Sequence, residues 1–134
     1  MKTRNHSKKR EAILSKIRST KIHPNAEWVY NELKADFPDL SLATVYRNIT
    51  LFLEDGTLQT VATVSGRERF DGDLSPHQHF ICKTCDAIID LHIDLPQGDL
   101  EQSFTASEME LDHLSLIAYG TCATCRKAND ALSS

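Results

Sequence analysis

The chain has 134 residues, of which 40% are hydrophobic and 25% are charged, and its formal net charge at pH 7 is -4. This length suits one ordinary domain or two small ones, and the composition is that of a folded cytosolic protein. No apolar run approaches the length of a membrane span and no repeat is present, which excludes an integral membrane protein and a repeat protein.

The charge is unevenly distributed along the chain. Residues 1–70 hold 12 Lys and Arg against 8 Asp and Glu, a balance of +4, whereas residues 71–134 hold 3 against 11, a balance of -8. A basic first half suits contact with a polyanion, and an acidic second half suits cations or partners. Many solvated surfaces are equally uneven, so charge by itself does not decide the function.

Two helices are predicted at the start of the chain. The first seven residues are polar, and we expect them to be frayed. From Lys8 the apolar residues recur at helical spacing as far as Ile17, and Pro24 ends the segment because the residue before a proline leaves the helical region. A second helix is predicted between Pro24 and Phe37-Pro38. Its buried stripe is predicted to be Ala26, Val29, Tyr30 and Leu33.

A third helix is predicted over residues 42–53. Ser41 can cap its first turn, because a serine hydroxyl accepts a hydrogen bond from an exposed amide there, and Asp55-Gly56 ends it. Three apolar residues are predicted to face inward: Val45, Ile49 and Phe52. The outer face then holds Ala43, Thr44, Tyr46, Arg47 and Thr50.

A β-hairpin is predicted after the third helix. Residues 57–64 alternate and are rich in β-branched side chains, and residues 67–71 return after the turn at Ser65-Gly66. Three helices and a hairpin form the winged helix-turn-helix plan, whose third helix enters the major groove of DNA. Arg47 suits this role because its planar fork can bind guanine or phosphate at two points. The alternative is a small helical module with no nucleic acid partner. The DNA-contacting residues predicted on this helix are Ser41, Ala43, Thr44, Tyr46 and Arg47.

Residues 72–76 are predicted to link a winged-helix domain at 1–71 to a second domain at 77–134. The second domain is predicted to be a small α/β unit. Its predicted elements are strands at 79–82 and 87–93, a helix at about 97–106, a long strand at about 109–119 and a short helix at 126–134. The predicted fold class is therefore α+β.

All four cysteines fall in two C-x2-C pairs, Cys82 with Cys85 and Cys122 with Cys125. Two such pairs can fold into a tetrahedral zinc site with four thiolate ligands. One pair alone could be a redox dithiol, and a disulfide framework would require an oxidising compartment, to which no apolar signal segment directs the chain. Two pairs with no spare cysteine favour structural Zn²⁺ in a cytoplasmic protein.

Two histidines precede the first cysteine pair. In a strand, His77 and His79 project to one face, whereas Phe80 and Cys82 project to the other. The imidazoles and the thiolates are therefore predicted to belong to two different sites, one rich in nitrogen and one rich in sulfur.

These features resemble the ferric-uptake-regulator (Fur) family over most of the chain. The resemblance rests on motifs in a specific order: His23-Pro24, Ser41-Leu42-Ala43-Thr44-Val45-Tyr46-Arg47-Asn48, Arg69-Phe70-Asp71, His77-x-His79-Phe80-Ile81-Cys82-x2-Cys85, Ile89-Asp90 and Tyr119-Gly120-x-Cys122-x2-Cys125. It implies a cytoplasmic, homodimeric, metal-responsive repressor that binds a palindromic DNA operator. The implied architecture is an N-terminal winged helix and a C-terminal dimerisation domain, with no catalytic residues and no membrane contact.

The resemblance, carried over residue by residue, implies a regulatory metal site. Its ligands would be His23, Asp71, His77, His79 and Asp90. Three imidazoles and two carboxylates suit Fe²⁺ or Mn²⁺ and leave a coordination position open. Each residue taken singly has an ordinary explanation as a helix cap, a strand histidine or a solvated charge, and only their joint fit to one motif favours ligands.

Position 90 indicates a branch within the family. An aspartate there resembles the peroxide-sensing branch, called PerR, whereas iron-sensing members usually have glutamate. In that branch bound Fe²⁺ reacts with hydrogen peroxide and a ligand histidine is oxidised, here His23 or His79, which releases the operator. The alternative is an iron- or zinc-responsive repressor without peroxide sensing. Zinc sensing is the weaker version of this alternative, because no cysteine remains outside the two pairs to bind a sensed zinc ion.

The chain also departs from the family pattern. Many relatives begin with an extra basic helix before a Gln-Arg pair. This chain starts close to that pair, with Lys9-Arg10 in its place, and we predict that these two residues contact DNA. Many relatives have a further metal site, but proline and glutamine occupy two of its positions in this chain. His113 is therefore predicted to be structural or solvent-exposed, and His92 to neighbour the regulatory site without binding its ion.

Two functions of other classes remain open at this point. Two histidines and a carboxylate with open positions can form the centre of a non-haem iron enzyme, although nothing indicates a substrate pocket. A zinc-stabilised protein-interaction module is the other. Both predict no salt-dependent binding to duplex DNA, whereas a repressor that contacts several phosphates loses affinity steeply as salt rises.

Overall fold

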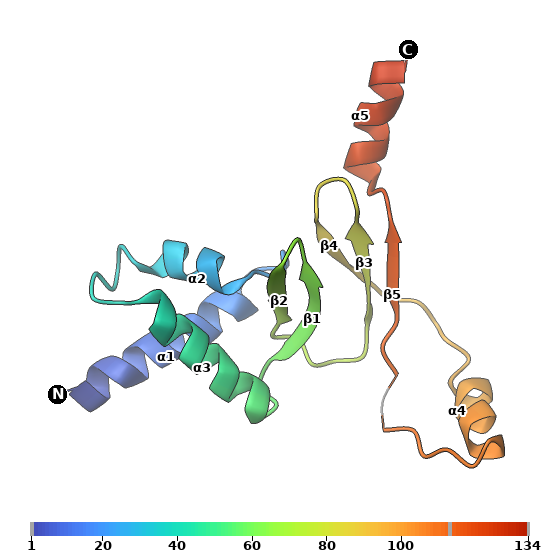
Figure 1. The fold of residues 1–134 in the computed structure, drawn as a ribbon, viewed down its shortest axis with the longest axis horizontal. Coiled ribbons are helices and arrows are strands. Elements are labelled where there is room, and N and C mark those ends of the chain that lie inside the picture. The colour runs from blue at the N-terminus through green and yellow to red at the C-terminus, as the bar shows by residue number, and fades with distance from the viewer. Residues whose placement is uncertain (1, 113, 134) are drawn as a thin grey trace. The chain divides into compact units, whose positions relative to one another are not determined.

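The structure is a computed structural model that describes residues 2–112 and 114–133 (Figure 1). The chain divides into two compact units, Met1–Ser75 and Pro76–Ser134. The first unit contains α1 (Lys2–Arg18), α2 (Ala26–Leu33), α3 (Leu42–Glu54), β1 (Gln59–Val64) and β2 (Arg67–Asp71). The second contains β3 (Gln78–Cys82), β4 (Ile88–Leu91), α4 (Gln97–Ala106), β5 (Ile117–Gly120) and α5 (Ala123–Ser133). The predicted α+β class is confirmed.

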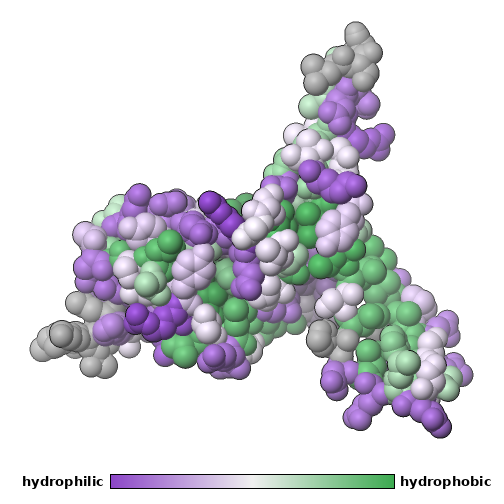
Figure 2. Space-filling view, viewed as in Figure 1, coloured by the Kyte–Doolittle hydropathy of each residue, from purple (hydrophilic) through white to green (hydrophobic). Residues whose placement is uncertain are grey.

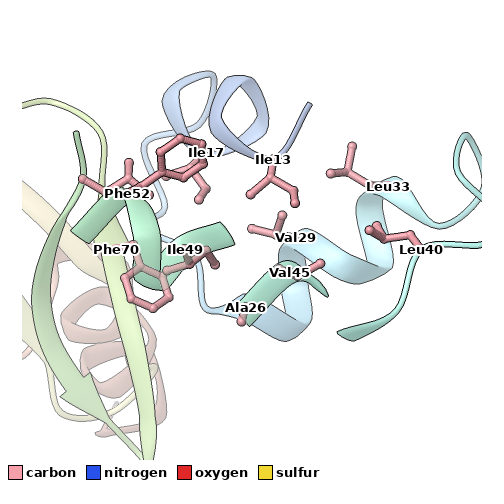
Figure 3. Close-up of a cluster of buried hydrophobic side chains, with 11 residues drawn as sticks. Ile13, Ile17, Ala26, Val29, Leu33, Leu40, Val45, Ile49, Phe52 and Phe70 are labelled. Atoms are coloured by element: carbon pink, nitrogen blue, oxygen red, sulfur yellow. The ribbon is translucent and has the colours of Figure 1, made fainter. Parts of the chain in front are cut away.

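The core of the first unit lies between its three helices. Figure 3 shows side chains from α1, α2 and α3 that point toward one another, with Phe70 of β2 beside them. Val45, Ile49 and Phe52 of α3 are buried, as the sequence predicts. Tyr30 is half-buried against this cluster rather than buried within it. Each buried Val, Ile or Phe contributes about 1.5–3 kcal/mol, so this cluster orients α3 and leaves its outer face exposed.

Side-chain caps begin two of the helices. The side chain of Asn25 accepts a hydrogen bond from the Trp28 amide at 2.8 Å, and Ser41 Oγ accepts one from the Thr44 amide at 3.1 Å. The start of α1 corrects a prediction, because this helix begins at Lys2 and not after a frayed stretch of seven residues. That stretch contains no proline or glycine, and residues such as Lys and Arg sustain a helix without any buried face.

The hairpin of β1 and β2 is antiparallel and joins the core at Phe70. Ser65 and Gly66 form its turn with positive φ angles of 52° and 79°, which is the backbone geometry of a tight hairpin turn. β2 ends at Asp71, which is 5% exposed. The hairpin therefore places the buried carboxylate of Asp71 at the end of the last strand of the first unit.

The sheet of the second unit has the strand order β4-β3-β5 (Figure 1). β3 is antiparallel to β4 and parallel to β5, with Cys82 opposite Gly120. A Cβ atom at Gly120 would lie 2.9 Å from the ring of Phe80, so this close approach requires glycine. Parallel strands end at the same edge of a sheet, and both C-x2-C pairs follow strand ends.

Three predicted elements of the second unit have different bounds. The predicted strand at 109–119 is wrong for most of its length, since β5 covers only Ile117–Gly120. Among the described residues, the alternating ones before Ile117 have no strand partner, because β3 begins at Gln78 and pairs with β5 only from Ile117 onward. β4 is shorter than the predicted 87–93, and α5 begins before the predicted 126. His77 lies just before β3, and His113 lies outside the described residues.

Among the described residues, none of the helices is both long enough and apolar enough to cross a bilayer.

Candidate metal centres and the exposed face of the third helix

The four cysteines come together at one edge of the β4-β3-β5 sheet. Cys82 ends β3 and Cys85 lies in the turn after it, while Cys122 precedes α5 and Cys125 lies in its first turn. One sulfur atom from each residue lies within 4.8 Å of the other three, and Cys85 Sγ is 3.8 Å from Cys122 Sγ. Four sulfurs about 2.3 Å from one Zn²⁺ would be about 3.8 Å apart, so the cluster has the dimensions of a tetrahedral zinc site.

The protonation of the sulfur cluster also fits a cation. The Cys122 amide donates a hydrogen bond to Cys82 Sγ at 3.3 Å, and this bond, helped by the Cys85 amide, lowers the pKa of Cys82 to about 6. Cys125 is shifted in the opposite direction, because its hydrogen bond with the side chain of Cys122, then burial, and last the repulsion from the Cys122 charge raise the pKa of Cys125 to about 12. A divalent ion would relieve this repulsion and allow all four sulfurs to ionise.

The first unit contributes a histidine and a carboxylate that face each other. His23 Nδ1 lies 3.6 Å from Asp71 Oδ2, and both residues are buried. The other oxygen, Asp71 Oδ1, accepts a hydrogen bond from the Asp73 amide at 2.8 Å, which fixes the carboxylate. The 3.6 Å separation is long for a hydrogen bond but suits two atoms that each lie about 2.2 Å from one ion.

The backbone at His23 is held in an unusual conformation by the neighbouring strand. Its φ is 53°, a left-handed value that is uncommon for residues other than glycine. Arg69 of β2 donates from Nη2 to the Ile22 carbonyl at 2.7 Å and from Nε to the His23 carbonyl, and the Phe70 amide donates to the Pro24 carbonyl at 3.0 Å. These bonds offset the strain and hold the imidazole beside Asp71.

We predict that Arg69→Met weakens binding of the regulatory metal by about 10- to 100-fold, the usual effect of losing a group that orients a ligand. The variant removes the donors to both carbonyls but keeps a long apolar stem. Titration with Mn²⁺ measures the affinity. Arg67→Met is the matched control, since Arg67 lies on the same strand and is exposed. Equal Mn²⁺ affinity in the two variants would contradict the role given to Arg69.

The second unit contributes two histidines that face one carboxylate. His79 and Asp90 lie opposite each other on β3 and β4. Both His79 Nε2 and His77 Nε2 are 3.4 Å from Asp90 Oδ1, and the two imidazole rings are 4.5 Å apart. His92 stacks on His77 at 6.0 Å between ring centroids, which agrees with a neighbouring role. These nitrogen and oxygen atoms are hard or intermediate donors of the kind that Fe²⁺ and Mn²⁺ accept.

The predicted DNA-contacting residues of α3 lie on its outer side. Ser41, Ala43, Tyr46 and Arg47 are exposed, and Thr44 is half-buried. The hydroxyl oxygens of Ser41 and Thr44 are 2.8 Å apart, so each already has a local partner. Tyr46 Oη donates a hydrogen bond to Glu27 Oε1 at 2.8 Å.

The two basic residues of α1 that were predicted to contact DNA make contacts within their own unit. Lys9 Nζ bonds Asp39 Oδ2 at 2.9 Å, and its side chain is 12% exposed. The guanidinium carbon of Arg10 lies 5.3 Å from the ring centroid of Phe52. The bond to Asp39 leaves Lys9 fewer donors for a phosphate, whereas the contact with a ring face uses none of the donors of Arg10.

Sequence analysis missed two residues of these sites. Arg69 belongs to the Arg69-Phe70-Asp71 motif, but the carbonyl groups that it binds lie 46 and 47 residues away along the chain. Glu27 was not singled out, and its partner Tyr46 is 19 residues away. No spacing rule connects residues so far apart, so only the structure could find these bonds.

Comparison with known proteins places the chain among regulators. The family model "Ferric uptake regulator family" matches residues 2–119. The peroxide operon regulator of Bacillus subtilis (strain 168) is 35% identical over 120 residues, which cover 88% of this chain and 81% of that protein.

Solved structures share the fold. The peroxide stress regulator of Campylobacter jejuni superposes with a TM-score of 0.76 at 27% identity, covering 90% of this chain and 91% of that one. A ferric uptake regulator from Francisella tularensis, solved with iron, has a TM-score of 0.76 at 25% identity, covering 88% of this chain and 91% of that one.

Proposed function

The chain belongs to the ferric uptake regulator family, and on that premise we propose that it is a metal-dependent transcriptional repressor that releases its DNA operator when hydrogen peroxide oxidises a ligand histidine. The family resemblance drawn from its motifs, including the likeness to peroxide-responsive members, is confirmed. The observation that carries the proposal is that the second unit holds two separate donor sets, one of four sulfurs and one of two imidazoles with a carboxylate. The first unit adds an imidazole that faces a carboxylate.

We assign structural Zn²⁺ to the sulfur set and regulatory Fe²⁺ or Mn²⁺ to the nitrogen and oxygen set. The proposed ligands of the regulatory ion are His23, Asp71, His77, His79 and Asp90. An ion that takes ligands from both units couples them, and it favours the DNA-binding state only by as much as it binds that state more tightly. Zinc binding removes the free thiolates, so the cysteines need not act as the sensor.

The proposed signal is a net insertion of one oxygen atom from hydrogen peroxide into a C–H bond of an imidazole ring, with water as the other product. A bound Fe²⁺ ion would supply one electron to break the O–O bond and would regain it when the ring is oxidised. The chain provides the acceptors for this oxygen, His23 and His79. Both are buried, so an oxidised and enlarged ring would no longer fit its place beside a carboxylate. Peroxide acts as a signal and not as a substrate that is turned over.

We predict that peroxide adds 16 Da to the peptide containing His23 or to the peptide containing His79 in the Fe²⁺-loaded protein. Mass spectrometry of a protease digest measures the addition. The Mn²⁺-loaded protein is the matched control, and we expect no addition there because Mn²⁺ is a much poorer reductant of peroxide. No added oxygen on either peptide, with operator binding that follows iron or zinc supply, would reject peroxide sensing in favour of the metal-responsive alternative.

We further propose that the cytoplasmic repressor is a homodimer on a palindromic operator. The second unit exposes large apolar side chains: Ile89, Ile93, Met109, Leu114, Leu116 and Tyr119. Figure 2 shows hydrophobic surface, in green, along β5 and the segment that leads to it. β5 is also an edge strand, and an edge next to apolar surface supports pairing with a second copy.

For the winged helix, we predict that Arg47→Ala weakens operator binding by about 10- to 100-fold while both metals remain bound. Loss of a bidentate contact to guanine or phosphate costs about 1–3 kcal/mol. Fluorescence anisotropy with duplex DNA measures the affinity at several salt concentrations. Lys127→Ala, which removes a positive charge from exposed α5, is the control for net charge. An affinity equal to that of Lys127→Ala would remove Arg47 from the DNA contacts.

A further inference from the structure

A hydrogen bond from the hydroxyl of Tyr46 joins the exposed face of α3 to α2. Tyr46 Oη donates to Glu27 Oε1 at 2.8 Å while the tyrosine residue stays 44% exposed. The other carboxylate oxygen, Glu27 Oε2, is buried and has no hydrogen-bond partner within the part of the chain that the structure describes. Glu27 therefore directs one carboxylate oxygen at the phenol, while its other carboxylate oxygen is closed off from water.

The charge state of the pair fixes the direction of this hydrogen bond. The bond from Tyr46 holds the pKa of Glu27 below its usual value, and the nearby Arg67 acts in the same direction. The same bond raises the pKa of Tyr46. At neutral pH the pair is thus a carboxylate and a phenol, and a carboxylate has no proton to donate. The phenol must donate its only proton to Glu27.

A phenol whose proton is committed can still accept hydrogen bonds through its oxygen. In the major groove, adenine presents the N6 amino group and cytosine the N4 amino group, both of which are donors. Thymine O4, guanine O6 and the phosphate oxygens are acceptors, and an oxygen that can only accept makes no hydrogen bond with them. The chemistry of the pair therefore selects between bases.

We propose that Glu27 is a positioning residue that makes Tyr46 an acceptor-only reader of the operator, specific for the amino group of adenine or cytosine at one position in each half-site. This inference rests on the proposed function, because it needs α3 to enter the major groove. It assigns to Glu27 an effect on base preference without any contact between Glu27 and DNA.

The test compares sequence preferences of the full-length protein loaded with Zn²⁺ and Mn²⁺. Wild type, Tyr46→Phe, Glu27→Ala and Glu32→Ala each select from a pool of randomised duplexes. Glu32→Ala is the matched control, since Glu32 is an exposed carboxylate on the same helix. Wild type and Glu32→Ala are expected to require adenine or cytosine at one position of each half-site.

The two variants of the pair should change that position in different ways. Tyr46→Phe is expected to lose the preference there and to bind the best duplex about tenfold less tightly, as for one lost hydrogen bond. Glu27→Ala frees the phenol proton, so thymine and guanine should become acceptable at the same position while the other positions keep their preferences.

Three results would overturn the inference: an unchanged profile in Glu27→Ala, an unchanged profile in Tyr46→Phe, or a loss of preference at every position in Glu27→Ala. The last result would assign Glu27 to the fold of the unit alone. If Glu27→Ala does not fold, Glu27→Gln replaces it, because glutamine has the same size without the negative charge and should also make thymine and guanine acceptable at that position. Wild type without any sequence preference would instead reject the proposed function itself.

Discussion

Cys85→Ser is expected to release the structural Zn²⁺ and to unfold or dissociate the second unit. A serine hydroxyl stays protonated where a thiolate is required, so three ligands remain for a site that needs four. Binding of structural zinc contributes about 10–16 kcal/mol in small domains at neutral pH, which is comparable to the whole stability of an ordinary domain. Zinc content per chain and the thermal unfolding curve measure the effect.

The thin core of the second unit explains why this effect should be so large. Among its described residues, the buried apolar side chains are Ile81, Ile88 and two of the four cysteines. A unit with so little buried apolar surface depends on a metal for its stability. Thr84→Ser is the matched control, because Thr84 is exposed within the same turn. Retention of one zinc ion per chain and an unchanged unfolding midpoint in Cys85→Ser would refute the assignment.

Asp71→Asn is expected to lower the affinity for regulatory Mn²⁺ by at least about 100-fold and to abolish metal-dependent operator binding. Asparagine has nearly the same shape, and its carbonyl oxygen can keep the 2.8 Å hydrogen bond from the Asp73 amide. It replaces the anionic oxygen that faces His23 with an uncharged amide, which is a poor ligand for these ions. The loss should exceed the 10- to 100-fold caused by removing a group that only orients a ligand.

Mn²⁺ titration and DNA binding with and without Mn²⁺ measure the two effects. Asp73→Asn is the matched control, since Asp73 is an exposed carboxylate two residues away that accepts a hydrogen bond from the Ser75 amide at 2.9 Å. Zinc content should be normal in both variants. Wild-type Mn²⁺ affinity in Asp71→Asn would exclude Asp71 as a ligand. Normal Mn²⁺ affinity together with lost DNA binding would mean that Asp71 links metal binding to DNA binding without being a ligand of the ion.

Local sequence signals predicted the elements whose stability is local. The helix that bears Arg47 is defined by the Ser41 cap, by inward residues at helical spacing and by Asp55-Gly56 at its end, and all three agree with α3. Each of these signals acts within a few residues, so no knowledge of the rest of the fold was needed. The domain boundaries and the metal and DNA contacts of individual side chains stay predictions.

Elements that depend on a distant partner were predicted less well. The alternation before Ile117 resembles a strand, but a strand exists only where a neighbour supplies hydrogen bonds, and β3 offers partners only to Ile117–Gly120. The bonds of Arg69 to the backbone near His23 and of Tyr46 to Glu27 join segments that the sequence keeps far apart.

The sequence by itself therefore determined the chemistry that this protein carries: two thiol pairs with zinc spacing, a set of imidazoles and carboxylates, and a helix with an arginine-bearing outer face. Tertiary structure alone decided how these groups are oriented. The parallel pairing of β3 with β5 brings both thiol pairs to one edge, and Arg69 holds His23 in a left-handed conformation beside Asp71. The physical reason is that the residue type sets the chemistry of a side chain, whereas the orientation of that side chain depends on hydrogen bonds between residues that only folding brings together.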